Sequence, residues 1–156
     1  MAPETAIRLA ADGDAEAVAR LIVAFREYYG EAEPDDAAIL SVVRDLLGDQ
    51  RTEFLLAGDP PAGVAQLRFR PSVWTGTHDC WLEDVFVVEE ARRAGLGRAL
   101  MEACEERARA RGCRRIQLDA NENNQRAVAL YESLGFQCGK PGRWDDGRDL
   151  YWTKWL

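Results

Sequence analysis

The sequence predicts a single α/β domain in which a mixed sheet is flanked by helices. Its 156 residues are near the usual size of one domain, and 47% of them are apolar, which suffices for a buried core. Segments with helical spacing alternate with short apolar or alternating segments, in the order strand, two helices, three strands, helix, strand, helix, two strands. The central strand–helix–strand segment indicates a crossover unit. We therefore expect one domain over residues 1–156.

The first third of the chain predicts a strand and two helices. Residues 7–9 form the strand, and Asp12 or Asp14 is expected to cap the first helix by accepting its free N–H groups. The apolar residues of this helix recur at helical spacing: Val18, Leu21, Ile22 and Phe25. The second helix begins near Asp35 or Asp36 and ends at the next glycine. Its apolar residues have the same spacing: Ile39, Val42, Val43, Leu46 and Leu47.

Three strands follow in the middle of the chain. The first two cover residues 54–57 and 64–70, with a glycine- and proline-containing turn between them. Alternation in the second of these strands predicts an exposed polar face: Gln66, Arg68 and Arg70. A loop that holds Trp74 then leads to residues 81–88, the strongest strand candidate in the sequence.

The last third predicts two helices and three strands. A helix from about Leu96 to Arg111 places Leu96, Leu100, Ala103 and Cys104 on one face. On its outer side, Glu105 and Arg109 are spaced to form an ion pair. The second helix is opened by Asn123 or Asn124, and three strands complete the order: residues 115–119, 136–138 and 149–155.

Composition argues against several classes of function. A net charge of −7 disfavours a broad basic surface for nucleic acid. No apolar run reaches the roughly 18–20 residues of a membrane span, and the first residues lack a signal-peptide pattern, so we expect a cytoplasmic protein. His78 is the single histidine, which leaves no expected metal site or histidine-dependent triad. The cysteines lie far apart and are expected to be buried or partly buried free thiols: Cys80, Cys104, Cys113 and Cys138.

A turn rich in arginine and glycine precedes the central helix: Arg92, Arg93, Ala94, Gly95, Leu96, Gly97 and Arg98. Glycines let the backbone approach a ligand, and a helix start adds free N–H groups and partial positive charge. A pyrophosphate fits this arrangement best, although a tight connection without a ligand fits the same glycines. The dinucleotide fingerprint requires glycine where Leu100 stands, and the P-loop requires a lysine after Gly97, so both alternatives fail.

With a second motif, this turn resembles the GNAT superfamily of N-acetyltransferases. Three stretches carry the resemblance: Leu82–Val87, Arg92-x-x-Gly95-x-Gly97, and Asn124-x-x-Ala127-x-x-Leu130-Tyr131. The resemblance implies the GNAT fold, with a mostly antiparallel sheet of about seven strands flanked by about four helices. It also implies an acyltransferase with acetyl-CoA as its donor.

The same resemblance implies where acetyl-CoA binds. Its pantetheine would pair with the backbone of Val85, Phe86 and Val87. The turn from Arg92 to Arg98 would hold the pyrophosphate, and Asn124 and Tyr131 would also contact the coenzyme. Arg93 stands where such proteins often have glycine, so we expect the loop to differ in local shape.

The expected chemistry is direct attack by an amine, without a covalent enzyme intermediate. An alkyl ammonium has a pKa near 10.4, so at neutral pH it needs a base. Glu83 is the candidate base, and Tyr131 is the candidate acid that protonates the departing sulfur. A salt-bridged carboxylate at the end of a sheet and a core aromatic are the ordinary alternatives for these two residues. Asp84 points to the opposite strand face by alternation, and it would hold a cationic substrate if that face is the inward one.

Within the superfamily, the resemblance is closest to spermidine/spermine- and thialysine-type members, which implies a small aliphatic amine as acceptor: a polyamine, a diamine or an amino acid. Four residues would line its pocket by aromatic contact and charge, or be ordinary core and surface residues: Tyr28, Glu27, Trp74 and Asp84. Two other classes stay open, a protein N-terminal or lysine acetyltransferase and a non-catalytic acyl-CoA-binding module. Family members are often dimers, so a homodimer is a further expectation.

Overall fold

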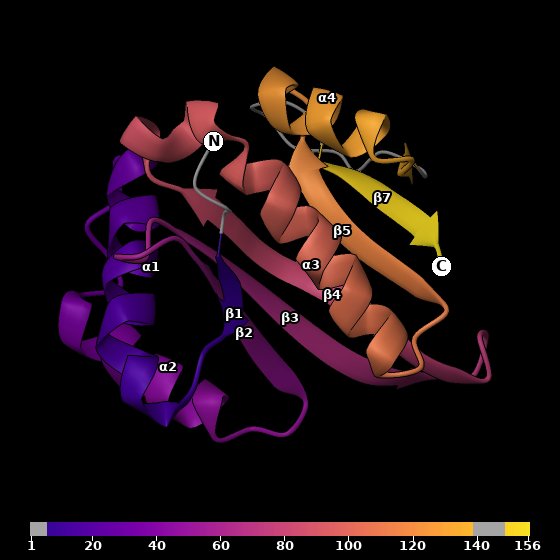
Figure 1. Ribbon diagram of the computed structural model, residues 1–156, viewed down its shortest axis with the longest axis horizontal. Helices are drawn as coiled ribbons and strands as arrows, with labels where there is room; N and C mark the ends of the chain where they lie inside the picture. Colours follow the sequence, from indigo (N-terminus) through magenta and orange to yellow (C-terminus); the bar gives the residue numbers. More distant parts are fainter. Residues whose placement is uncertain (1–5, 139–148) are drawn as a thin grey trace. The chain divides into compact units, whose positions relative to one another are not determined.

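The computed structural model describes residues 6–138 and 149–156, and its elements follow the predicted order (Figure 1). The four α-helices of this described part are α1 (Ala15–Tyr28), α2 (Asp36–Leu47), α3 (Leu96–Ala110) and α4 (Gln125–Ser133). The strands are β1 (Ile7–Leu9), β2 (Thr52–Ala57), β3 (Gly63–Ser72), β4 (Thr77–Val87), β5 (Arg115–Asn121), β6 (Gln137–Cys138) and β7 (Asp149–Trp155). Short 3-10 turns cover Asp12–Asp14 and Glu89–Ala94.

The strands form one mixed sheet of seven strands in the order β1-β2-β3-β4-β5-β7-β6. β4 and β5 are parallel, with Cys80 opposite Ile116, and α3 is the crossover between them. β1 with β2, β2 with β3, β5 with β7 and β6 with β7 are antiparallel. The predicted fold class, a mostly antiparallel mixed sheet flanked by helices, is therefore confirmed.

The chain forms two compact units, and each is described by itself. Unit 1 is the chain up to Arg68 together with Glu83–Cys104, and unit 2 is Phe69–Leu82 together with Glu105 to the C-terminus. Strands β3 and β4 and helix α3 contribute residues to both units. The expectation of one domain over the whole chain stays a prediction.

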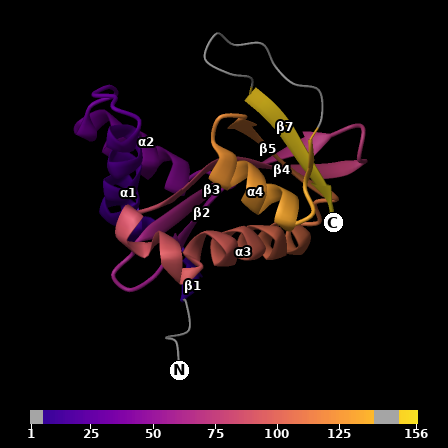
Figure 2. The same ribbon diagram turned by 90° about the horizontal axis from the view of Figure 1, so that it is seen from above.

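In unit 1, α1 and α2 bury their apolar faces against β2 and β3 (Figure 2). Val18 and Leu21 of α1 are fully buried, and Ile39 and Val43 of α2 join them in the same core. Val42 was expected on this face but is 54% exposed. Ile39 and Val43 are one helical turn apart, and Val42 lies about 100° around the helix from its neighbour, which turns it to solvent.

The two predicted helix caps differ in outcome. Asp35 caps α2, since its carboxylate accepts a hydrogen bond from the Ala38 N–H at 2.8 Å. Asp14 stands before α1 but makes no side-chain cap, and Asp12 lies instead in the 3-10 turn. The Asp14 carboxylate accepts from Arg8 Nη1 at 2.7 Å and from the Ala11 N–H at 2.8 Å. The prediction that Asp12 or Asp14 caps α1 through its side chain is therefore wrong, because Arg8 and the preceding turn engage that carboxylate.

Strand β3 is more deeply buried than alternation predicts. Arg68 and Arg70 are exposed as expected, but Gln66 is buried. Val64, on the same strand face as Gln66, belongs to the core formed with α1 and α2. Gly63 lies against Leu100 of α3, where an added Cβ would be 3.0 Å from the leucine Cδ1. The first half of β3 is thus covered on both faces, which a pattern of alternation cannot indicate.

In unit 2, β3, β4, α3, β5 and β7 and the residue before β6 contribute buried apolar side chains, among them Phe69, Leu82, Ala108, Ile116, Leu118, Phe136 and Trp152. Glu105 and Arg109 form the predicted ion pair at 3.5 Å, but Glu105 is buried rather than on the outer side. Lys154 of β7 donates to the Glu105 carboxylate at 2.6 Å. The prediction of an outer-side position for Glu105 is wrong because β7 supplies a cation that stabilises the carboxylate inside.

The cysteines are free thiols, and three of them are buried as expected: Cys80, Cys104 and Cys113. Cys138 is exposed, so the expectation of at least partial burial is wrong for it, since β6 has just two residues and both are exposed. No helix in the described part of the chain is long and apolar enough to cross a membrane. Among residues 6–138 and 149–156, no three His, Cys, Asp or Glu side chains are grouped so that they could hold a metal ion.

Candidate active site

The arginine- and glycine-containing loop lies at the end of β4, in unit 1. A 3-10 turn, Glu89–Ala94, contains the first three residues of the expected turn, Gly95 follows it with φ of 76°, and the last three residues of the expected turn belong to α3. A Cβ on Gly95 would meet no atom within 4 Å. Backbone conformation, rather than lack of space, therefore favours glycine at this position.

Helix α3 begins directly after this glycine. The first hydrogen bond of its ladder runs from the Ala99 N–H to the Gly95 carbonyl at 3.1 Å. The N–H groups of Leu96 and Gly97 therefore precede the ladder, at the part of a helix that binds anions. Leu96 is buried and fixes the helix start, whereas Arg98 is exposed. An exposed helix start preceded by glycine and flanked by arginine suits a phosphate group.

Arg92 points from the 3-10 turn toward α1. Its Nε donates to the Val87 carbonyl at 2.9 Å, and its guanidinium carbon lies 4.5 Å from the ring centroid of Tyr28. The same guanidinium lies 5.7 Å from the ring centroid of Phe86. Two residues predicted for different ligands, Arg92 for coenzyme and Tyr28 for acceptor, are thus in contact. The side chain of Arg93 lies outside the described residues.

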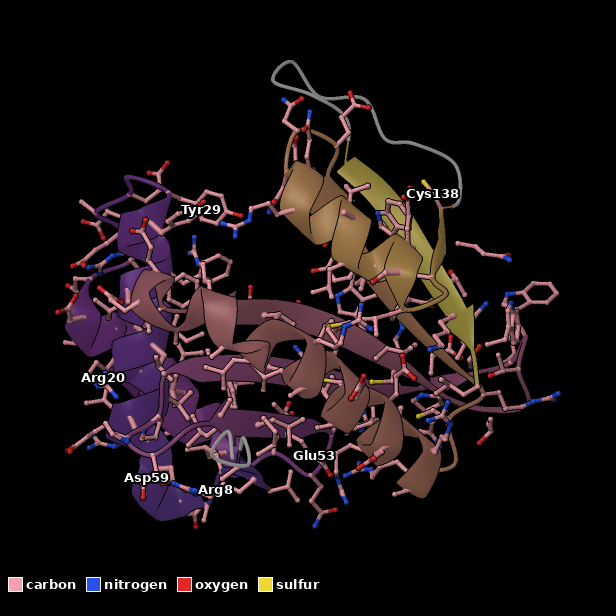
Figure 3. All side chains as sticks on the ribbon, turned by 45° about the horizontal axis from the view of Figure 1, so that its top comes forward. Arg8, Arg20, Tyr29, Glu53, Asp59 and Cys138 are labelled. Atoms are coloured by element: carbon pink, nitrogen blue, oxygen red, sulfur yellow. The ribbon has the colours of Figure 1, made fainter. Side chains whose placement is uncertain are left out.

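An aromatic cluster of Phe25, Tyr28, Tyr29 and Phe86 joins the end of α1 to β4. Phe25 stacks on Phe86 with ring centroids 5.0 Å apart, and Tyr29 lies 5.1 Å from Phe25. Tyr28 and Tyr29 are 58% and 60% exposed, so the cluster has a buried base and an accessible rim. Figure 3 shows Tyr29 at this end of α1. Exposed aromatic rings of this kind can bind a cation.

The neighbouring carboxylates Glu83 and Asp84 differ in environment. Glu83 is exposed, whereas Asp84 is half-buried and shares its strand face with Leu82 and Phe86 by alternation. Partial burial raises the pKa of Tyr29, and the negative charges of Tyr28 and Asp84 add to that rise. Strand alternation places Asp84 on the same side of β4 as Phe86, whose ring packs on Phe25 of α1. Glu27, on the last turn of α1, is exposed.

The remaining predicted site residues belong to unit 2. Asn124 caps α4, since its side chain accepts from the Ala127 N–H at 3.2 Å. Tyr131 is half-buried, and its ring centroid lies 5.9 Å from that of Phe136 and 6.4 Å from that of Trp152. Trp74 lies in the turn between β3 and β4 and is 89% exposed. The aromatic packing of Tyr131 therefore fixes its ring from one side.

Sequence reasoning missed Tyr29 and the ring of Phe86 as parts of the cluster. A signal existed for the helix residues, because Phe25, Tyr28 and Tyr29 have the i, i+3, i+4 spacing that places side chains together on a helix. No local signal related them to Phe86 or Arg92, which are far along the chain.

Comparison with known proteins identifies the class. Residues 18–136 match the acetyltransferase (GNAT) family. The thialysine N-epsilon-acetyltransferase of Bos taurus is 30% identical over 142 residues, covering 84% of this chain and 83% of that protein. The N-acetyltransferase YhfO of Bacillus subtilis (strain 168) is 30% identical over 133 residues, covering 84% and 89%. The solved structure of a putative acetyltransferase from Arthrobacter sp. FB24 superposes with a TM-score of 0.82 at 30% identity, covering 93% of each chain.

The chain therefore belongs to the acetyltransferase (GNAT) family. It is an N-acetyltransferase, and the acyl donor of this family is acetyl-CoA.

Proposed function

We propose that this enzyme acetylates a primary amine of a small molecule of the polyamine, diamine or amino acid type. The observation that carries the proposal is that Asp84 shares a face of β4 with Phe86, whose ring stacks on Phe25 in the α1 cluster of exposed tyrosines. A carboxylate next to aromatic rings suits an alkyl ammonium group through charge and cation–π attraction. Relatives named for acetylation of thialysine at its ε-nitrogen support the same class of acceptor.

For the donor, the backbone N–H groups at the start of α3 hold the pyrophosphate, in a loop that reaches from Arg92 through Arg93, Ala94, Gly95, Leu96 and Gly97 to Arg98. The backbone of Val85, Phe86 and Val87 pairs with the pantetheine arm, and Asn124 and Tyr131 are two further proposed contacts of the coenzyme. Acetyl-CoA supplies the activated acetyl thioester, and the residues of the chain supply binding and proton transfer.

For the acceptor, Asp84 is the anionic anchor, and the rings of Tyr28 and Tyr29 are the aromatic wall beside it. Glu27, the residue before Tyr28 on α1, adds negative charge. Trp74 stays a predicted contact of the acceptor, in the turn between β3 and β4.

Glu83 acts as the base, directly or through a water, and accepts the proton that the acceptor ammonium must lose before its nitrogen attacks the acetyl carbon. As the carbon–sulfur bond breaks, the Tyr131 hydroxyl donates its proton to the sulfur. The nitrogen loses its second proton to water as the amide forms, and Tyr131 regains a proton from water. Backbone N–H groups near Val85 polarise the acetyl carbonyl as oxyanion donors. Asp84 binds the positively charged group of the acceptor. It takes no part in proton transfer, because alternation turns it to the opposite face of β4 from Glu83.

A thiol-release assay with acetyl-CoA and a panel of amines tests the proposed function. We expect turnover with aliphatic diamines, polyamines or amino acids that carry a side-chain amine, and no comparable turnover with peptides. Preferred acetylation of peptide N-termini or lysines would identify a protein acetyltransferase instead. Binding of acetyl-CoA without thiol release across the panel would indicate a non-catalytic acyl-CoA-binding module.

Two variants test the roles of Glu83 and Asp84 separately, and each removes one negative charge with little change in shape. We expect Glu83→Gln to move the rise of kcat/KM to higher pH, because the amine must then lose its proton without the base. We expect Asp84→Asn to raise KM for cationic acceptors about tenfold while the pH profile keeps its shape. A pH profile of Glu83→Gln identical to that of the wild type would remove Glu83 as the base.

A homodimeric state is proposed from the family resemblance, and a cytoplasmic location stays a prediction from the sequence. Light scattering of the purified protein at several concentrations measures the first, and cell fractionation measures the second.

A further inference from the structure

We propose that Arg92 is a positioning residue that fixes the loop before α3 to the aromatic cluster of α1, rather than a direct ligand of the coenzyme phosphates. The inference rests on the proposed coenzyme site. It concerns unit 1 alone, in which Arg92, Tyr28, Phe86 and Val87 all lie.

The first observation is the hydrogen bond of the Arg92 side chain to the strand that precedes it. Nε donates to the Val87 carbonyl at 2.9 Å, which closes the 3-10 turn onto the last residue of β4. The Val88 N–H also donates to the Ala62 carbonyl at 2.9 Å, so the chain is held on both sides of this point. One of the donors of the guanidinium is therefore already used by the protein itself.

The second observation is the stacking of the same guanidinium on two rings. Its central carbon is 4.5 Å from the Tyr28 centroid and 5.7 Å from the Phe86 centroid. A planar guanidinium combines stacking with charge attraction on an aromatic face, and an ammonium cannot reproduce this geometry. Tyr28 ends α1 and Phe86 lies on β4, so one side chain joins a helix, a strand and the loop.

The third observation is that the rings beneath Arg92 form a fixed support. Phe86 is 7% exposed and belongs to the main core of the unit, and Phe25 stacks on it with an interplanar angle of 23°. Tyr28 lies 6.3 Å from Phe86, so it rests on the same support. Arg98, by contrast, is exposed on the first turn of α3 and is the arginine placed to meet an anion.

The affinity for acetyl-CoA therefore depends on Tyr28, a residue of α1 that carries no positive charge. If Arg92 sets the course of the loop, removal of Tyr28 and removal of Arg92 disturb the same contact. The loss of acetyl-CoA affinity in the double variant is then smaller than the product of the two single losses. If Arg92 binds phosphate directly, its loss has the same effect whether Tyr28 is present or not.

A double-mutant cycle with isothermal titration calorimetry of acetyl-CoA compares these losses. We expect Arg92→Ala to weaken binding about 3- to 10-fold in the wild-type background and less than about 2-fold in the Tyr28→Leu background. Tyr28→Phe, which keeps the ring, serves as the matched variant and retains the full effect of Arg92→Ala. Tyr29→Leu changes a similarly exposed ring for which the described residues show no cation–π contact with Arg92. We expect the fold-losses of affinity from Tyr29→Leu and Arg92→Ala to multiply in the double variant. Losses that multiply in the Tyr28→Leu background would overturn the proposal.

Charge and stacking are separated by two further measurements. Arg92→Lys keeps the charge but not the planar stack, so we expect it to bind acetyl-CoA as weakly as Arg92→Ala. Wild-type affinity of Arg92→Lys would show that charge alone matters and would overturn the positioning role. The salt dependence of the acetyl-CoA Kd should be the same for Arg92→Ala and the wild type, since no phosphate contact is lost. A clearly reduced salt dependence in Arg92→Ala would likewise contradict it.

The outcomes also distinguish this inference from the proposed function. A wild-type protein that does not bind acetyl-CoA would refute the coenzyme site itself. A wild-type protein that binds it, with losses that multiply, would refute the role of Arg92 alone. Tyr28 is 58% exposed, and thermal melts of each variant identify any loss of folding before the Kd values are compared.

Discussion

Replacement of Gly95 tests whether the loop before α3 must hold its left-handed backbone to bind acetyl-CoA. Gly95 has φ of 76°, a conformation that costs an ordinary L-residue about 1–2 kcal/mol. An added Cβ would touch nothing within 4 Å, so Gly95→Ala adds this conformational strain and no clash. We therefore expect the variant to fold, with its strain confined to the loop.

The magnitude follows from where the strain is relieved. Because Ala94 and Gly95 are exposed, we expect the altered loop to relax out of the left-handed conformation when no ligand is bound. Binding must then restore that conformation, and 1–2 kcal/mol corresponds to a Kd that is about 5- to 30-fold weaker. Gly95→Val should weaken binding further, because a β-branched residue is a stronger outlier at positive φ.

Gly76→Ala is the matched control for this experiment. Gly76 has φ of 72°, also has open space around a Cβ, and lies in the turn between β3 and β4. We expect it to lower the melting temperature by a few degrees and to leave acetyl-CoA affinity unchanged, as measured by scanning fluorimetry and calorimetry. Wild-type affinity of both Gly95 variants would refute the claim that the loop amides bind the pyrophosphate.

Three other predictions concern proton transfer and stability. Tyr131→Phe should lower kcat about tenfold or more and keep the Kd of acetyl-CoA, and unchanged kcat would remove Tyr131 as the acid. Hydrogen bonds from Arg8 and then from a backbone N–H lower the pKa of Asp14 from 3.8 to about 2, so their stabilisation is complete above about pH 4 and lost as the pH falls through 2. The melting temperatures of Arg8→Gln and the wild type should therefore converge between those pH values, and a constant difference would contradict this. Lys154→Met should lower the free energy of urea unfolding by about 1–3 kcal/mol, because it removes the shorter ion pair of the buried Glu105 carboxylate and leaves the 3.5 Å pair with Arg109, and Lys154→Met with Glu105→Leu should recover most of that loss.

The order of elements could be predicted from the sequence because its signals are local. Helical spacing defined α1 and α2, and Asp35 marked the start of α2 as a cap. The errors lie where distant residues decide the environment. Glu105 is buried because Lys154 pairs with it, and Gln66 is buried because helices cover its strand face. No pattern within a few residues of either position carries that information.

Part of the candidate site was likewise predictable from the sequence, and part depends on residues that are distant in the chain. The loop with Gly95 and Gly97 was predictable, since a strand, a glycine turn and a helix start are consecutive in the chain. The partner of Arg92 was not, because Tyr28 belongs to a helix distant in sequence. An arginine next to a predicted phosphate loop is interpreted as an anion ligand when its charge alone is known. Its contacts with Val87 and Tyr28 give it a different role.

The placement of Arg92 also affects how the acceptor and donor sites depend on each other. Tyr28 offers a ring to the proposed amine and simultaneously supports the guanidinium that fixes the loop. Tyr29 offers a similarly exposed ring and no such contact in the structure. Because Tyr29 lies 5.6 Å from Tyr28, a change at Tyr29 reaches Arg92 through Tyr28, whereas a change at Tyr28 removes the contact with Arg92 itself and alters the affinity for acetyl-CoA directly. Evolution or engineering of acceptor specificity in this enzyme is thus freer at Tyr29 than at Tyr28.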